Sequence, residues 1–455
     1  MHSDVKPLVT SRLQATAALQ PMQAQESKVG FYLVLASLLF EFGRPQELLP
    51  GIKLIPFATL LDVLLLLNVL MSGKLDLSKL QTKMWIPLLI VMAIHVPIAV
   101  NNFWALMTLK DMLLIFGLYL GIVTYVNSLE KMLTLMKVWI GINGFLAVMG
   151  VAKGGSGIGG WMGDENDFCM VMNMAAPFAY FLLFSAANVV EKMKYLGFLG
   201  TFILAAMASL SRGGFMGLAS VGAYCWYRSP KKGNALAVLA IVALFMVLMA
   251  PETYWDEIAS STSDETMGDE GTGGARLYTW GVGVDMFFYN PIIGIGQSNF
   301  PWTFEKYETA KFHDRSFGGR EAHSAWVTLL SELGIAGIVI VGGMLLQSYK
   351  DLRLVRKRFA PAASKQLHGQ TVKAGEDVRV HLARAMEGSL IGFIVSGVFI
   401  SIIWYPSLWI MMALIVALRN ISEVDGEALR QHAVLPRYPM GVPLPKLGGQ
   451  PINHL

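Results

Sequence analysis

Three residues that could act on a phosphate ester stand next to long apolar stretches of the sequence. Arg212 lies in "SRGG" at 211–214, Arg276 begins "RLYTWGVGVDMFFYN" at 276–290, and His323 directly precedes an apolar run. An arginine fork matches phosphate oxygens bidentately and stays charged at every working pH. A histidine that opens a helix is kept neutral by the helix dipole, and a neutral imidazole can accept a proton from a hydroxyl. The three residues together suit attack by a hydroxyl on a carbon whose leaving group is a phosphate.

Each of these residues also has a plainer interpretation. Arginines at a membrane edge commonly extend to lipid head groups, which would account for Arg212. Arg276 could anchor a surface helix, and an isolated interfacial His323 could be structural. The catalytic hypothesis therefore depends on all three converging on one face.

Three carboxylates accompany them. Glu332 follows His323 by nine residues, which places it about 13 Å along a helix and nearly on its opposite side. We therefore expect Glu332 to hold neighbouring helices rather than to pair with His323, since an acid within a membrane is costly and usually has a role. Asp164 and Asp167 in "GDENDF" at 163–168 could cap a helix, ligate a divalent cation or bind sugar hydroxyls, and capping is the expectation.

The composition indicates an all-α polytopic membrane protein. Of 455 residues, 54% are hydrophobic and only 15% are charged, whereas a soluble protein carries roughly 25% charged residues. Apolar stretches near the length of a membrane span recur along the chain. Cys169 and Cys225 both fall within such stretches, so buried thiols are expected rather than a disulfide or a metal site.

We predict about twelve transmembrane helices, with both termini on one side. They lie near residues 31–49, 54–72, 85–101, 107–126, 132–152, 167–187, 195–211, 213–227, 234–250, 323–347, 385–403 and 406–420.

Basic residues orient these spans, because cytoplasmic loops are enriched in Lys and Arg. The connections 73–83, 188–194 and 228–233 are basic, and 349–384 contains "RLVRKR" at 353–358. All four fall on one side, which we assign to the cytoplasm. The net charge of +4 sits largely in the last of them, and anionic lipid suits it better than nucleic acid.

The resulting organisation has five parts. These are a cytoplasmic N-terminal segment 1–30, spans one to nine within 31–250, a periplasmic loop 251–322, spans ten to twelve within 323–420 with a basic cytoplasmic loop 348–384, and a Pro-rich cytoplasmic tail 421–455 expected to be disordered.

The long external loop has three distinct parts. Residues 252–270 are acidic and suggest flexibility. Leu277, Trp280, Val284 and Phe287 recur at helical spacing and predict an amphipathic helix on the outer membrane surface. "NPIIGIG" at 290–296 predicts a turn, since no strand precedes its glycines.

Several segments resemble a known family. "LSRGGFMGL" at 210–218, "ARLYTWGVGVDMFFYNPIIGIGQSNF" at 275–300 and "EAHSAWVTLLSELGIAG" at 321–337 are similar to signature segments of the O-antigen ligase and polysaccharide polymerase superfamily. Their order and spacing also match, over roughly residues 150–345. "EFGRPQELLPG" at 41–51 is similar to members found with exopolysaccharide synthesis.

The resemblance implies an O-antigen ligase-like membrane glycosyltransferase of cell-surface polysaccharide biosynthesis. Such proteins take a glycan from undecaprenyl diphosphate at the periplasmic face of the inner membrane and pass it to a hydroxyl, without nucleotide sugar, cofactor or metal. By position, Arg212 and Arg276 would hold the diphosphate and His323 would be the catalytic base. The implied partners are a lipid-linked glycan, a glycan or lipid acceptor, membrane lipids and other polysaccharide-assembly proteins.

The acceptor stays open at this point. A polymerase must hold two anionic lipid-linked glycans, and a second cationic group exists in Lys306, Lys311, Arg315 and Arg320, although acids lie among them. This and the N-terminal resemblance favour a polymerase over an O-antigen ligase that uses lipid A–core or protein. A secondary transporter or flippase is a more distant alternative, since transporters show paired repeats and polar sites at mid-membrane. A non-enzymatic scaffold would leave the arginines and the histidine without a reason.

Overall fold

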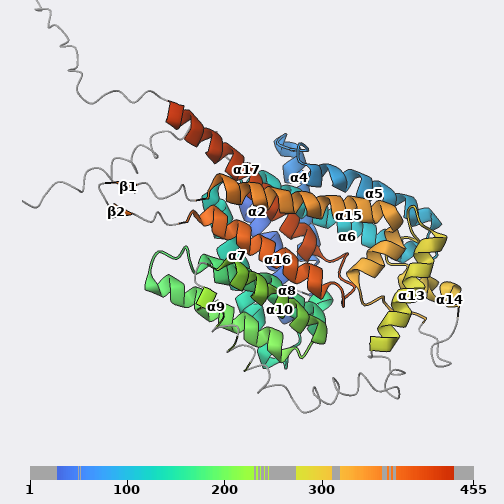
Figure 1. Ribbon diagram of the computed structural model, residues 1–455. Coiled ribbons are helices and arrows are strands. Elements are labelled where there is room, and N and C mark those ends of the chain that lie inside the picture. Colours follow the sequence, from blue (N-terminus) through green and yellow to red (C-terminus); the bar gives the residue numbers. More distant parts are fainter. Residues whose placement is uncertain are drawn as a thin grey trace, which may run out of the picture.

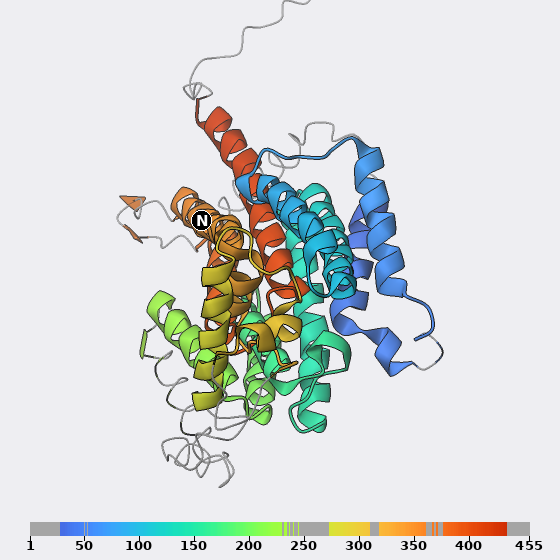
Figure 2. The ribbon, with the colours of Figure 1, turned by 90° about the vertical axis from the view of Figure 1, so that its right-hand side faces the viewer.

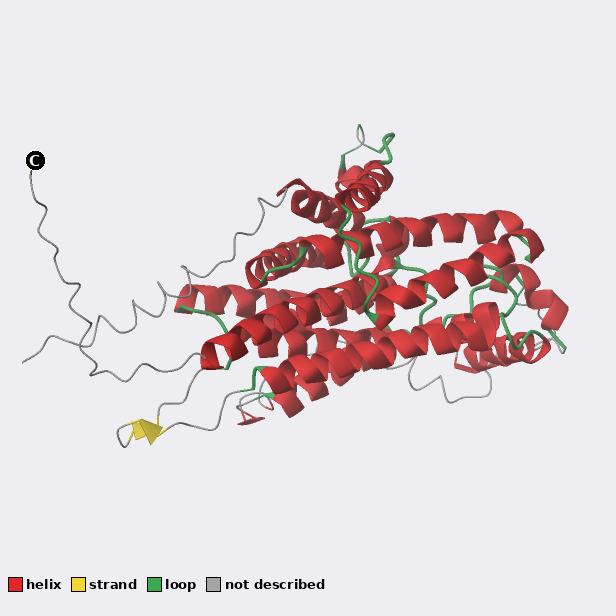
Figure 3. Cartoon of the chain, turned by 90° about the horizontal axis from the view of Figure 1, so that it is seen from above, coloured by secondary structure: helices red, strands yellow, loops and turns green. Residues whose placement is uncertain are grey.

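The computed structural model describes residues 28–49, 53–229, 273–309, 318–360 and 376–434, together with a few isolated positions between these ranges. Within them the chain is helical except for two antiparallel strands of two residues each, β1 (Gln366–Leu367) and β2 (Gln370–Thr371). Most helices run along one common direction (Figure 1, Figure 3). The predicted all-α class is therefore confirmed.

The N-terminal half contributes most of the helices. They are α2 (Lys28–Leu38), a π-helical turn η1 (Leu39–Gly43), α3 (Pro45–Leu48), α4 (Phe57–Ser72), α5 (Leu80–Ile98), α6 (Asn102–Tyr125), α7 (Leu129–Ala152), a 3₁₀ turn η2 (Gly160–Met162), α8 (Glu165–Leu182), α9 (Val189–Ala208) and α10 (Arg212–Arg228). The C-terminal half adds α13 (Gly273–Tyr289), α14 (Phe300–Tyr307), α15 (Ala325–Arg358), α16 (Val378–Ser396) and α17 (Pro406–Val434).

Most predicted spans overlap one helix each, but 31–49 is divided at Arg44 into α2 with η1 and α3, and 385–403 continues past the end of α16 at Ser396. The span 234–250 falls largely outside the described residues. Five described helices are long and apolar enough to cross a membrane, namely α5, α6, α7, α15 and α17, and α4 is apolar but shorter. The number of twelve spans therefore stays a prediction.

Two boundaries were wrong. The helix α15 continues to Arg358 and includes "RLVRKR", which we had placed in a loop, and α17 continues to Val434 instead of ending at 420. Residues 421–434 hold Glu, Ala, Leu and Arg and no proline, so they favour helix once a span has nucleated it. An ion pair between Arg419 and Glu423, at 2.7 Å, adds support across this junction.

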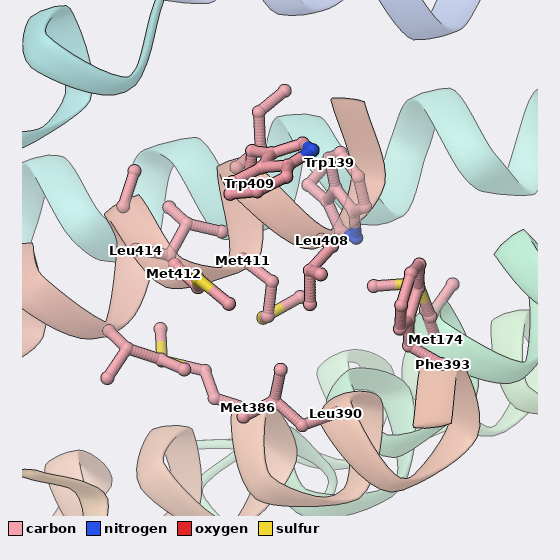
Figure 4. Packing of buried hydrophobic residues seen from close by; sticks show 14 of the residues in the cluster. Trp139, Met174, Met386, Leu390, Phe393, Leu408, Trp409, Met411, Met412 and Leu414 are labelled. Carbon is pink, nitrogen blue, oxygen red and sulfur yellow. The ribbon is translucent and has the colours of Figure 1, made fainter. Parts of the chain in front are cut away.

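The core lies where α17 packs against α6, α15 and α16. Trp409 of α17 stacks at a tilt on Trp85 of α5, with ring centroids 4.8 Å apart. Met411 and Met412 of α17 face Met386 and other apolar side chains of α16 and α8 (Figure 4). The prediction of buried thiols is also confirmed, because Cys169 and Cys225 are both free and buried.

The two ends of the bundle differ in chemistry. At one end Arg228 and Arg356 both reach Glu387, at 3.4 and 3.2 Å, and Lys79 pairs with Glu423. The other end carries α13 and α14, opposite to β1 and β2 (Figure 1). We call this second end the α13 end; α6, α8, α10, α15 and α17 all begin there, and it holds the site described next.

Candidate active site

A cavity of about 850 Å³ opens at the α13 end. Its walls come from the π-helical turn η1 with α3, the N-terminal halves of α4 and α6, the turn η2 and the start of α8, the segment 298–302, the start of α15 with the residues before it, and the segment 399–406. The predicted residues His323, Glu332, Asp164 and Asp167 line it, whereas Arg212, Arg276 and Arg320 do not. The structure thus brings helices far apart in sequence to one enclosure.

His323 stands just outside α15. Ser324 is the N-cap of that helix, and its hydroxyl accepts a hydrogen bond from the Val327 amide. The expectation that His323 opens the helix was therefore wrong by two residues. Before His323, the carbonyl of Ala322 accepts a hydrogen bond of 2.9 Å from the indole of Trp280 in α13. After it, the amide of Ala325 donates to the carbonyl of Gly397, at 2.8 Å. These bonds fix the backbone on both sides of His323.

The imidazole is exposed to the cavity, and nearby groups still shift its protonation. Desolvation by the surrounding protein lowers the pKa of His323, the charges of Arg276 and Arg320 lower it further, and Asp164 opposes them. The imidazole is therefore neutral at neutral pH, as expected. The cause differs from our expectation, because desolvation and two arginines act rather than the dipole of a helix that His323 does not open.

Left-handed backbone gathers around the cavity. His323, Ser298 and Arg44 have φ angles of 47°, 53° and 46°, and all three line it. Non-glycine residues adopt this region at a cost of about 1–3 kcal/mol and persist there only when their surroundings hold them. Such strain concentrates at functional sites, so the cavity is more than a packing defect.

Glu332 ties three chain segments together. Its buried carboxylate accepts hydrogen bonds from the amides of Ser298 and Phe300, at 2.7 and 3.0 Å, and from the indole of Trp404, at 2.8 Å. A buried carboxylate is tolerated only when its oxygens are paired in this way. The predicted role in holding neighbouring elements agrees with this arrangement, although the partners are loop amides rather than helices.

A break in α15 receives the segment "NPIIGIG". Gly334 has a non-helical backbone, with φ of 59°. The amides of Ile335 and Ala336 donate to the carbonyls of Pro291 and Ile292, and the amides of 295 and 296 donate to the carbonyls of 331 and 332. A Cβ at position 334 would lie 2.7 Å from the Pro291 oxygen, so only glycine fits. The predicted turn is confirmed, and it also satisfies the backbone of the broken helix.

The predicted helix in the long loop is present as α13, and it packs against α14. Its protein face is formed by Ala275, Val282 and Met286, which pack with Phe300 and Phe304 of α14. Leu277, which we placed on the apolar face, is exposed, as is Phe288 beyond it. Its position on a membrane surface stays a prediction.

Arg212 and Arg276 flank the cavity. Arg212 is the first residue of α10, where a cation adds to the positive end of the helix dipole instead of opposing it. Its neighbour Ser211 caps the helix and donates to Asn166, at 2.6 Å, and Asn166 lines the cavity. Arg276 lies in the first turn of α13 and acts on the pKa of His323. Arg212 is thus linked to the cavity through Ser211 and Asn166, and Arg276 through its charge on His323. Figure 2 views the molecule from this end, with α13 in front.

Asp164 and Asp167 cap α8, as expected. The carboxylate of Asp164 accepts from the Asn166 amide, at 2.8 Å, and Asp167 lies in the first helical turn beside the Tyr405 hydroxyl. Within the described residues no group of three or more His, Cys, Asp or Glu is placed to hold a metal ion.

The family comparison matches this same part of the chain. Residues 197–342 match the family model described as O-antigen ligase. The chain carries an O-antigen ligase-like domain. No curated protein matches it. The domain runs from α9 into α15 and includes Arg212, Arg276, His323 and Glu332, so the resemblance inferred from sequence is confirmed and a glycan-transferring membrane enzyme is indicated.

The other wall of the cavity lies outside the O-antigen ligase-like domain, and sequence reasoning missed it. Glu41, Arg44 and Gln46 come from "EFGRPQELLPG", and Asp62 comes from α4. Gly160 makes room for them, because a Cβ there would lie 2.1 Å from an Arg44 nitrogen. One signal was available, since Asp62 is the only acid in the apolar sequence of α4.

Proposed function

We propose that this protein is an inner-membrane glycosyltransferase that moves a glycan from undecaprenyl diphosphate to a sugar hydroxyl at the periplasmic face. The observation that supports this most is the position of His323. Its neutral imidazole borders the cavity, while Arg276 and Arg320 act on it from outside the cavity wall. A base thus stands between a cationic region and an enclosure large enough for sugars.

The chemistry needs no group beyond these side chains. An acceptor hydroxyl in the cavity gives its proton to His323, and its oxygen bonds to the anomeric carbon of the donor sugar. The bond between that carbon and the phosphate oxygen breaks, and the diphosphate leaves with the electron pair. Arg212 and Arg276 stabilise its charge, and His323 passes the proton to water.

The proposed topology places the α13 end in the periplasm and both termini in the cytoplasm. Basic residues at the opposite end support it, among them Lys79, Arg228 and Arg356. The five-part organisation, with its loop 251–322 facing the periplasm, is proposed on the same ground.

We further propose that the acceptor is a second lipid-linked repeat, so that the protein polymerises an exopolysaccharide or O-antigen. Of the second cationic group, Lys306 lies over the ring of Tyr307, and Arg320 acts on His323. Lys311 and Arg315 lie outside the described residues. The alternative is an O-antigen ligase, which the description of the matched family favours.

A transporter is less well supported. Transporter sites use broken helices that line an open polar site. The described part of α15 is broken, but the chain's own segment 291–296 fills the break with four hydrogen bonds. The broken helix therefore builds a wall instead of a pathway.

The test uses purified protein in liposomes. Given only undecaprenyl-diphosphate-linked repeat units, it should make longer lipid-linked chains, and His323→Ala should stop this without changing its amount in the membrane. Transfer that begins only when lipid A–core is added would identify a ligase. Vectorial movement of intact lipid-linked glycan without any new bond would refute the transferase.

A further inference from the structure

We propose that the wall formed by Arg44, Gln46 and Asp62 is the acceptor subsite, and that it binds hydroxyl groups of an uncharged sugar. This inference rests on the proposed transferase function and specifies which part of the cavity holds which substrate.

The side chains of the lining separate the two substrates. Seven acidic side chains and one arginine line the cavity, whereas Arg212, Arg276 and Arg320 remain outside it. An enclosure with this excess of carboxyl groups is unsuited to a diphosphate, which needs cations or amide donors. The donor's diphosphate therefore belongs on the arginine side of His323, and the cavity is left for the acceptor.

Unpaired buried atoms show what kind of ligand fits. Asp62 is only 5% exposed and its Oδ1 has no hydrogen-bond partner, and neither do Gln46 Oε1 and Arg44 Nε. All three residues line the cavity. Buried polar atoms left unpaired are costly, so such a group implies a ligand that pairs with them. Two acceptors beside one donor match sugar hydroxyls, each of which both donates and accepts.

Aromatic rings beside these atoms are held in place. The indole of Trp161 donates to Glu41, at 2.9 Å, and its ring contacts Phe42 and Tyr405, with centroids 5.4 Å apart in each pair. Trp161 and Tyr405 both line the cavity. A fixed indole offers an apolar face to the C–H groups of a pyranose ring, while the polar atoms take its hydroxyls.

The strained turn explains how this wall is built. The π-helical turn η1 ends at Gly43, and the left-handed backbone of Arg44 separates it from α3. Single π-helical turns recur at functional sites.

Binding of oligosaccharides to purified protein in nanodiscs tests the subsite without any need for transfer. The probes are cellotetraose, maltotetraose and tri-N-acetylchitotriose as neutral ligands, with tetragalacturonate as the acidic one, measured by saturation-transfer NMR. We expect at least one neutral probe to bind and the acidic probe not to bind. Asp62→Ala should weaken binding about tenfold, the effect of leaving a buried sugar hydroxyl without its hydrogen-bond partner.

The matched control is Glu130→Ala, which removes an exposed acid in the first turn of α7 and should leave binding unchanged. If Asp62→Ala does not fold, Gln46→Ala provides the same comparison. The proposal is overturned if no neutral probe binds, if the acidic probe binds better, or if both wall variants bind like wild type. It is also overturned if Asp62→Ala weakens undecaprenyl phosphate instead of the oligosaccharide.

Failure of this subsite can be told apart from failure of the transferase. A protein that makes no glycan chain but binds a neutral oligosaccharide through Asp62 refutes the transferase alone. A protein that makes chains while Asp62→Ala leaves the KM for the acceptor unchanged refutes the subsite alone. With both correct, Asp62→Ala raises the KM for the acceptor and leaves the KM for the donor as it was.

Discussion

His323 combines a left-handed backbone, exposure to the cavity and a lowered pKa. None of these features would be needed by a histidine that only fills space. The surroundings keep it neutral, so it can act as a base without a carboxylate partner of its own.

The rate should therefore depend on pH in a defined direction. The base acts when neutral, and its pKa lies below the usual 6.5. As the pH is lowered, kcat/KM should therefore stay level past pH 6.5 and fall only at lower pH. Arg320→Gln removes a charge that lowers this pKa, so the acid limb should move to higher pH by a few tenths of a unit. Asp164→Asn keeps a capping side chain but removes a charge that raises the pKa, so the limb should move the other way. Shifts in the same direction for both variants would contradict the electrostatic account.

The two arginines that flank the cavity should not tolerate lysine. Arg212→Lys and Arg276→Lys keep the charge but lose the planar fork, and we expect transfer to fall about tenfold or more. Both proteins should be present in membranes at wild-type amounts, which immunoblotting checks. Full activity in both variants would leave them as interfacial anchors.

Transfer by the purified protein should survive EDTA. Asp164 and Asp167 have capping and hydrogen-bonding roles that need no cation, and the arginines can neutralise a leaving diphosphate. The measurement is chain formation before and after chelation. Loss that magnesium or manganese restores would make these two residues ligands.

Among the elements, the junction of α15 with the segment 291–296 carries most of the site's geometry. It positions the side chain of Glu332, which accepts hydrogen bonds from the amides of Ser298 and Phe300. Ser298 lines the same cavity as His323. The sequence predicted the helix and the turn separately. It could not predict their junction, because a glycine in an apolar run is compatible with an unbroken helix and the hydrogen bonds join residues some 40 positions apart.

A pair of glycine variants in this one helix tests the junction. Gly334→Ala forces a Cβ into a left-handed backbone against Pro291, so it should lower the thermal midpoint and the activity. Gly342→Ala meets nothing within 4 Å and should leave stability unchanged or improve it. Equal midpoints in a thermal unfolding assay would show that the break is not needed.

Over the whole molecule, apolar stretches located most of the long described helices, since membrane spans are set by length and hydropathy. The side of the site with Arg212, Arg276 and His323 was also predictable, because each of these residues stands at or next to the start of a helix. The opposite wall was missed, because Arg44 carries no local pattern, and the single acid Asp62 in α4 does not by itself indicate that it shares a cavity with His323. This is why the residues inferred to contact the acceptor lie outside the matched domain.

The orientation of the molecule decides whether these parts can work together, since the lipid-linked donor must reach His323 from the periplasm. Single cysteines test it: Thr266→Cys lies in the predicted periplasmic loop and Gln370→Cys in the predicted cytoplasmic one. A membrane-impermeant maleimide added to intact cells, with the outer membrane permeabilised, should label position 266 and spare 370. The native Cys169 and Cys225 are buried and give the background signal, and lysed cells, in which both new positions should react, give the control. Labelling of 370 alone in intact cells would invert the molecule, place His323 and both arginines in the cytoplasm and remove the basis for a periplasmic transferase.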